Sequence, residues 1–234
     1  MKRTLLTIAL ILSSSAVLAE TVYPKNPVLR PITLTEGTIA VGGAVAYVEE
    51  GDDDRGNINF HAAYGFTDDL TLSLGDIRYR FWDRLDNGTG LELTAGFGIR
   101  GYHESKLNGD ALALGADITG KYVFNRDFAA TFSAGYVKWD EEHLKNKDEY
   151  RYSVGLQRNL FKDVTFAANY TYRDLKDFKQ SHADEVNLAL NYTFSKRMDL
   201  GVFAGYSNFD AKQNGYDLDD GYERTAGVYV NYRF

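Results

Sequence analysis

Charged side chains alternate with apolar ones in several segments of the chain. In Asp76-Ile77-Arg78-Tyr79-Arg80-Phe81 the charged residues take every second position, so in an extended strand they share one face. The mid-strand charged residues are Asp76, Arg78, Arg80, Glu92, Arg100, Asp117, Lys121, Arg151 and Arg173. Six of the nine are basic. If such strands close into a barrel with this face inward, the basic side chains line its lumen and favour anions. All of them except Asp76 are predicted to line a pore.

A second group with possible chemistry is His103-Glu104-Ser105. A His two residues from a Ser lies on the same face of a strand and could act as its base. The pair continues the outward parity of Leu91 to Ile99, but spacing alone names no acid or amide to orient the His. Surface loop residues are the alternative interpretation.

Acidic residues cluster in two loops, as Glu49-Glu50 with Asp52-Asp53-Asp54 and as Asp217 with Asp219-Asp220. Neither cluster fits the calcium-loop pattern, because aligning Asp52 and Asp54 puts Asn57 where Gly is needed. Solvated loops, or weak bridges to lipid phosphates, explain them. We therefore predict no metal site and no cofactor.

The elements that position these residues alternate apolar and polar residues with a period of two. Typical apolar faces are Leu91-Leu93-Ala95-Phe97-Ile99 and Val164-Phe166-Ala168-Tyr170-Tyr172. Regular alternation over many segments predicts an all-β protein, a barrel or a sandwich. We expect a single antiparallel up-and-down barrel over 37–234.

The strand count depends on residues 70–82. Leu70, Leu72 and Leu74 have even numbers, whereas Ile77, Tyr79 and Phe81 have odd ones, so the apolar face changes at Gly75-Asp76. A tight hairpin there gives about twelve strands, with ten as the alternative count. A β-bulge within one strand is the competing explanation of the change of face.

Turn lengths assign the two ends of the barrel. Asn125-Arg126-Asp127, Lys162-Asp163 and Lys196-Arg197 are short, whereas the connections near 49–56, 140–148, 174–184 and 208–221 are long and polar. Outer-membrane barrels have short periplasmic turns and long extracellular loops.

The N-terminal part has its own composition. Lys2 and Arg3, the apolar run Leu5–Leu12 and Val17-Leu18-Ala19 predict a signal peptide over 1–19. All three prolines lie within 20–36, which predicts an irregular periplasmic segment. This segment is either a loose leader or a small plug in the lumen.

The C-terminal strand presents Val228, Val230, Tyr232 and Phe234 on one face. An apolar strand that closes on a terminal Phe resembles the C-terminal signature of Gram-negative outer-membrane β-barrels. The resemblance implies a bacterial outer-membrane location. It also implies that the barrel assembly machinery reads these four residues, and that lipids and lipopolysaccharide surround the chain.

The same resemblance gives His103 and Ser105 a meaning, because some outer-membrane barrels are lipid hydrolases with a His-x-Ser pair on a lipid-facing strand. It implies a lipopolysaccharide or phospholipid acyl hydrolase as an alternative function. Lys106 departs from the Asn common after the Ser in lipopolysaccharide deacylases of this kind.

Composition agrees with a barrel. The chain has 17 Tyr, 14 Phe and no Cys, which excludes thiol chemistry. Its mean hydropathy is -0.37, which a polar lumen explains. Without the predicted signal peptide, 24 basic and 33 acidic residues give a net charge of -9, which argues against nucleic acid as a partner.

The sequence therefore predicts a porin-like channel for small polar or anionic solutes. By size and strand count it resembles small twelve-stranded porins for acidic oligosaccharides. A closed barrel, with its inner charges paired, and a surface-binding barrel remain open alternatives. Twelve strands fall between small filled barrels and large open porins.

Overall fold

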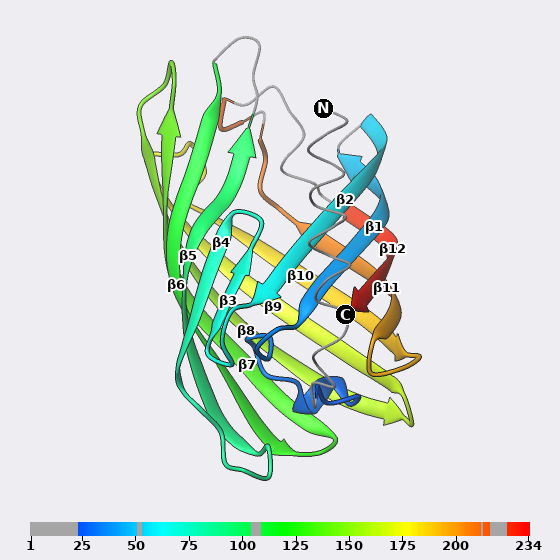
Figure 1. The fold of residues 1–234 in the computed structure, drawn as a ribbon. Coiled ribbons are helices and arrows are strands. Elements are labelled where there is room, and N and C mark those ends of the chain that lie inside the picture. Colours follow the sequence, from blue (N-terminus) through cyan, green and yellow to red (C-terminus); the bar gives the residue numbers. More distant parts are fainter. Residues whose placement is uncertain (1–22, 51–52, 104–108, 212, 216–223) are drawn as a thin grey trace, which may run out of the picture.

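The computed structural model describes residues 23–50, 53–103, 109–211, 213–215 and 224–234. Twelve antiparallel strands form a closed barrel in which each strand pairs with its neighbours in sequence (Figure 1). The strands are β1 (Ile39–Glu50), β2 (Asp53–Gly65), β3 (Leu70–Ser73), β4 (Asp76–Trp82), β5 (Gly90–His103), β6 (Ala111–Asn125), β7 (Phe128–Glu141), β8 (Lys147–Phe161), β9 (Val164–Lys176), β10 (His182–Thr193), β11 (Met198–Ser207) and β12 (Arg224–Arg233). Among the described residues, no helix is long and apolar enough to cross a membrane.

The first and last strands close the barrel. β1 pairs with β12 from Ala40 opposite Arg233 to Glu49 opposite Arg224. Along β12, Val228 and Val230 point outward and are 57% and 40% exposed. Alternation of this kind puts apolar side chains outside and polar ones inside, as the period-two pattern predicts.

The hairpin prediction for residues 70–82 is confirmed. β3 and β4 pair from Leu70 opposite Tyr79 to Ser73 opposite Asp76, with the turn at Leu74-Gly75. Gly75 takes a φ of +80°, which favours a residue without a side chain. The barrel has twelve strands, so the count of ten and the bulge explanation are wrong.

The two ends of the barrel differ as predicted, but several connections are shorter than expected. The long connections expected near 140–148 and 174–184 shorten to residues 142–146 and 177–181, because β7 to β10 extend into them. The loop expected near 49–56 is largely strand, because β1 and β2 extend to residues 50 and 53. The connection from β4 to β5 covers residues 83–89 and is the longest at the short-turn end. The stretch near 49–56 is largely strand because β1 and β2 pair with each other continuously up to Glu50 opposite Asp53.

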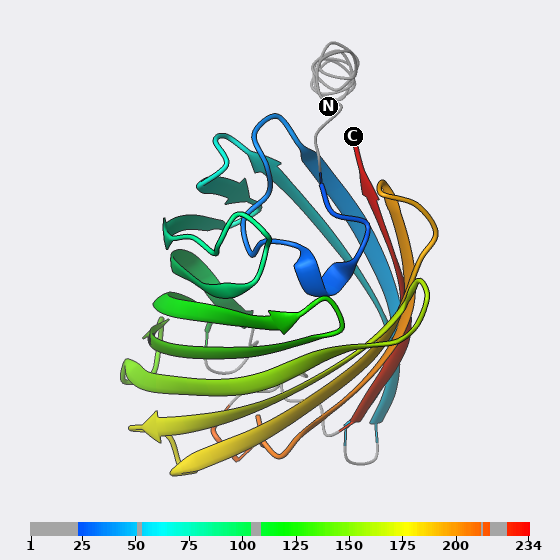
Figure 2. The same ribbon diagram turned by 90° about the horizontal axis from the view of Figure 1, so that it is seen from below.

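The N-terminal segment crosses the barrel at the short-turn end. Seen from that end, residues 23–38 lie inside the ring of strands, with the short 3₁₀ helix η1 (Pro27–Leu29) near its middle (Figure 2). Val28 is fully buried against Val123 and Ala129. The loose-leader alternative is therefore wrong for residues 23–36. The predicted signal peptide, residues 1–19, lies outside the described residues.

A second apolar cluster lies at the long-loop end. Trp139, Leu175 and Phe209 belong to it, together with small residues such as Ala113 and Ala183. Phe209 comes from the chain after β11, so that loop folds over the inner wall of β6 to β10. The lumen is thus narrowed from both ends.

Candidate pore and its N-terminal plug

The N-terminal plug, defined as Tyr23–Glu36, is held to the wall by an arginine–aspartate–arginine cluster. Arg30 Nη1 and Nη2 lie 2.7 and 2.9 Å from the two carboxylate oxygens of Asp199 on β11. Arg233 on β12 donates to the same carboxylate. The Asp199 side chain is 1% exposed, so two cations compensate one buried anion. Tyr23 lies against both guanidinium groups, and burial raises the pKa of its phenol.

Two predicted pore residues also hold the plug. Lys121 Nζ donates to the carbonyl oxygens of Pro27 and Arg30, at 3.2 and 3.0 Å. Glu92 is fully buried, accepts the Ile32 N–H at 2.7 Å and lies 3.2 Å from Arg84 Nε. Lys121 and Glu92 therefore anchor the plug, a role that strand alternation could not reveal.

Further hydrogen bonds and an ion pair attach the plug to other parts of the wall. The Leu34 N–H donates to Thr71 Oγ1 at 2.8 Å, and Asn26 Nδ2 donates to the Arg126 carbonyl at 2.6 Å. Lys25 pairs with Asp163 at 2.7 Å on a more exposed rim. Together with the contacts above, these bonds reach β3, β5, β6, β11 and the turns at Arg126 and Asp163, so the plug is a fixed part of the barrel.

A cavity of about 420 Å³ lies between the plug and the inner wall of β6 to β12. Its charged lining residues are Arg30, Lys121, Arg233 and Asp199, three basic and one acidic. Its other polar lining residues include Thr131, Gln157, Asn191 and Asn231. The cavity thus carries a formal excess of positive charge at the narrow end of the lumen.

The charges at mid-height on β4, β5 and β6 form a closed network. Arg78 Nη1 lies 2.9 Å from Asp117 Oδ1, and Arg100 bonds both Asp76 at 2.6 Å and Asp117 at 2.7 Å. Arg100 also approaches the wall opposite Gly115, where only a glycine leaves room. Two cations and two anions balance, so this network adds no net charge to the lumen.

A second network joins β8, β9 and β10. Glu149 is fully buried and accepts hydrogen bonds from Arg151, Arg173 and Trp139. Arg173 also pairs with Glu185 at 2.8 Å. The Arg151 side chain is 28% exposed, more than those of Arg78 and Arg100 at 18% and 16%, so it is the most accessible of these cations.

Arg80 completes the predicted set, away from both networks. It pairs with Asp69 at 2.8 Å and with Asp83 at 3.3 Å, near the short-turn end. The eight predicted residues therefore do not form one basic ring. They divide into two paired networks, two plug anchors and Arg80.

The cluster at Asp199 was not predicted from the sequence. Asp199 and Arg233 lie at strand ends on the inward parity, which was the available signal. Arg30 lies in a segment without periodicity, so its inward placement could not be read from the sequence.

Uncharged polar side chains take inward positions on β1's neighbours β2 and β12 and on β10. Asn187 and His61 are exposed although both hold inward positions. His61 and Asn231 lie over Gly42, so close that a β-carbon there would be 2.1 and 2.3 Å from them. Tyr229 Oη donates to Asn191 Oδ1 at 3.0 Å. Exposed inward side chains on these strands indicate space for solvent.

The strand parity from which the His–Ser pair was predicted changes before His103. The pairing of β5 with β6 shifts between Ile99 and Gly101, where Arg100 is the extra residue of a bulge. Tyr102 then faces outward, 53% exposed, and His103 pairs with the buried, inward Ala111. The outward parity of Leu91 to Ile99 therefore ends at the bulge, because the extra residue Arg100 reverses the alternation. Ser105 lies outside the described residues.

The acidic clusters are only partly described. Asp52, Asp217, Asp219 and Asp220 lie outside the described residues. Within the described ranges, no three His, Asp or Glu side chains come together as a possible metal site.

The family model for Gram-negative porins matches residues 32–212. This chain belongs to the Gram-negative porin family. None of the curated proteins matches it. Family membership covers β1 to β11 and the C-terminal part of the plug, so the barrel described here is a porin barrel of the outer membrane.

Solved porins share the fold at low sequence identity. The KdgM porin is 11% identical, with a TM-score of 0.55, covering 83% of this chain and 99% of that one. The KdgM porin in complex with disordered oligogalacturonate is 12% identical, with a TM-score of 0.53 and coverages of 84% and 99%. The NanC porin is 14% identical, with a TM-score of 0.49 and coverages of 83% and 98%.

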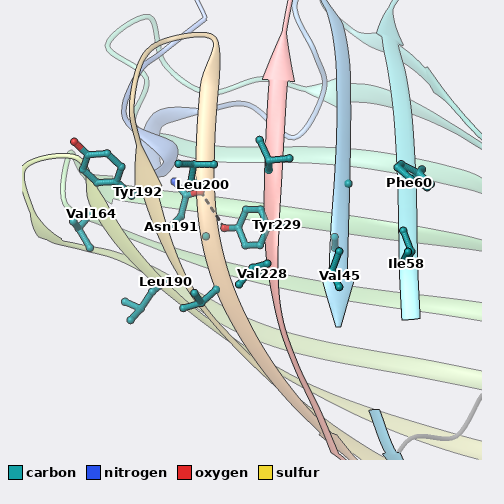
Figure 3. Close-up of a pocket in the computed structure, with 15 residues that line it drawn as sticks. Val45, Ile58, Phe60, Val164, Leu190, Asn191, Tyr192, Leu200, Val228 and Tyr229 are labelled. Carbon is teal, nitrogen blue, oxygen red and sulfur yellow. Dashed lines mark hydrogen bonds between the residues drawn. The ribbon is translucent and has the colours of Figure 1, made fainter. Parts of the chain in front are cut away.

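The outer surface carries the apolar face that a membrane barrel needs. A shallow hollow of about 660 Å³ runs across β1, β2, β10, β11 and β12, with Val45, Ile58 and Val228 among the side chains along it (Figure 3). Gly43 contributes no side chain at its centre. Such a surface contacts the hydrocarbon of the bilayer.

Proposed function

We propose that this porin-like channel is narrow, that the N-terminal plug sets its aperture, and that it passes small polar and anionic solutes. The carrying observation is the cavity beside the plug, where Arg30, Lys121 and Arg233 face a single acidic residue, Asp199. A solute that passes the plug must cross this positive region, which favours anions.

The rest of the lumen supports only a modest preference for anions over cations. The networks at Asp117 and Glu149 hold most of the mid-height arginines against carboxylates. The inward Asn187, Asn191 and Asn231 side chains offer hydrogen bonds without charge. We propose that Arg78, Arg80, Glu92, Arg100, Asp117, Lys121, Arg151 and Arg173 act as pore-lining or plug-holding residues, without a catalytic role.

The location rests on further proposals. Residues 1–19 act as a signal peptide for export across the inner membrane, and the barrel assembly machinery reads Val228, Val230, Tyr232 and Phe234. The terminal ring supports this role, because Phe234 is 44% exposed on the outer surface and packs edge-on against Tyr232. Lipids and lipopolysaccharide are then its surroundings, and the short-turn end with the plug faces the periplasm.

The test is single-channel recording in planar bilayers with the folded mature protein. We expect conductance steps and a reversal potential shifted toward that of the anion under a KCl gradient. The absence of conductance steps from the folded protein would overturn the proposal. It would favour a closed barrel, with the plug and the paired charges blocking the lumen. A cation preference would overturn the assignment of solutes.

A further inference from the structure

The β3–β4 hairpin is much shorter than the strands beside it. β3 pairs with β2 only from Ala63 to Gly65, and β4 pairs with β5 only as far up as Gly98. The Leu74 N–H bonds to the Ala62 carbonyl, and the Ile99 N–H bonds to the Gly75 carbonyl. Above these bonds, residues 53–61 of β2 and 100–103 of β5 have a strand partner on one side only, within the described part of the chain.

The size of this opening follows from sheet geometry. At the level of the hairpin, β2 and β5 are separated by three strand spacings, or about 14 Å at ~4.8 Å each. The nine residues 53–61 extend about 30 Å along β2, at ~3.3 Å per residue. Figure 1 shows both strands continuing beyond the hairpin tip.

Exposure supports an opening in the wall. Phe60 and Ile58 on the outer face are 78% and 63% exposed. Asn59 and His61, on the inner face at the same height, are exposed too. On the fully paired wall Thr94 and Thr171 are buried but Asn187 is exposed, so the opening is defined by the strand missing beside β2 together with this exposure. Among the described residues, both faces of β2 are thus accessible along the edge that has no neighbouring strand.

The opening lies at the depth of the membrane hydrocarbon. Ile58 is opposite Val45 on β1, and Val45 is opposite Val228 on β12, all three on the exposed apolar face. At this depth, backbone groups must be covered by protein or line a water-filled space. A single added strand would pair with one edge only, because the opening is two strands wide.

The two sides of the rim differ in chemistry. The outer rim is apolar, with Ile58, Phe60, Leu74 and Ile99 exposed by 50% or more. The inner rim is polar, with Asn59, His61 and the Arg100–Asp76 ion pair. We propose that this opening is a lateral portal that admits an amphiphile with a hydrocarbon chain from the membrane. Its polar group lies at the inner rim, and its chain lies between Phe60 and Leu74.

The portal goes beyond passage along the pore axis, because it connects the lumen with the membrane. Since the chain has no cysteine, His61→Cys allows a single fluorophore to be attached at the inner rim. Asn187→Cys is the matched control, since Asn187 is also an exposed inner residue but lies on β10, between two paired neighbours. Both proteins are folded into phosphatidylcholine vesicles whose acyl chains carry bromine as a quencher.

We expect acyl-chain quenching at residue 61 and none above background at residue 187. A variant with four residues added to each strand of the β3–β4 hairpin should seal the opening and abolish the quenching at residue 61. Equal quenching at both positions, or quenching that survives the sealed variant, would overturn the portal. The conductance of the sealed variant is recorded in parallel, so a failure of the axial channel is seen separately.

Discussion

At the scale of single residues, buried charges decide how the lumen is built. Asp199 is nearly inaccessible and shares two arginines, one from the plug and one from the last strand. Removing one partner from a buried ion pair is costly because the remaining charge keeps its desolvation penalty. The same reasoning applies to Glu92, which holds a backbone N–H of the plug and an arginine.

Arg30→Ala tests the anchor. It leaves Asp199 with Arg233 alone, and we expect a loss of about 3 kcal/mol in the free energy of unfolding. The measurement is denaturant unfolding in detergent micelles, followed by far-UV circular dichroism. The control is Lys25→Ala, which removes a more exposed plug–wall pair and should cost below about 1 kcal/mol. Equal losses in the two variants would contradict a special role for Asp199.

Gly98→Ala tests the close packing of the β3–β4 hairpin tip against β5. A β-carbon at residue 98 would lie 2.1 Å from the Gly75 carbonyl oxygen, so the hairpin tip must move. Overpacking against backbone should cost about 1–3 kcal/mol in the same unfolding measurement. Gly56→Ala on β2 is the control, because nothing lies within 4 Å of its β-carbon. Equal unfolding free energies for Gly98→Ala and the control would contradict this close packing of the hairpin tip against Gly98.

At the scale of elements, the plug and the short hairpin shape the lumen. The plug has almost no regular structure, and its place is fixed by side chains of β3, β5, β6, β8 and β11. The hairpin, by contrast, is short because its turn comes early, at Leu74-Gly75. One element thus narrows the lumen, and the other leaves the wall incomplete.

Deleting residues 23–34 tests the plug as an element. The narrowest cross-section limits the conductance of a pore, so we expect single-channel conductance to rise by more than about twofold. Replacing Lys25 by Ala in the full-length mature chain serves as the comparison, since it leaves the plug in place. An unchanged conductance in the deletion variant, once it is shown to be folded, would mean that the aperture lies elsewhere.

At the scale of the whole molecule, an acidic protein contains a locally positive cavity. The chain as a whole has a net charge of -7, yet the cavity at the plug has three basic residues against one acidic residue. Solutes respond to the local field in the narrow region, because salt screens charges beyond about 10 Å at 0.1 M ionic strength.

Salt dependence tests this view of the molecule. The anion preference in the reversal potential should be greatest near 0.01 M salt and weaken toward 1 M, since the screening length falls from about 30 to 3 Å. Lys145→Gln, on a loop and 77% exposed, should not change it. An anion preference that does not change with salt, or that disappears in Lys145→Gln, would show that it does not arise in the cavity.

The barrel, its strand order and its two kinds of ends could all be predicted from the amino-acid sequence. These follow from local rules, because alternation has a period of two and short turns force neighbouring strands to pair. Even the hairpin at 70–82 could be read from the change of parity at Gly75-Asp76.

The partners of the inner residues, by contrast, depend on contacts between segments far apart in the sequence. Arg30 meets Asp199 across 169 positions of the chain, and such a pairing depends on how the whole barrel closes. The bulge at Arg100 put Tyr102 on the outward face, because one extra residue reverses the alternation that follows it. The charges predicted to line one pore divide into separate networks because each buried cation needs a carboxylate within reach, and alternation specifies a face but no partner.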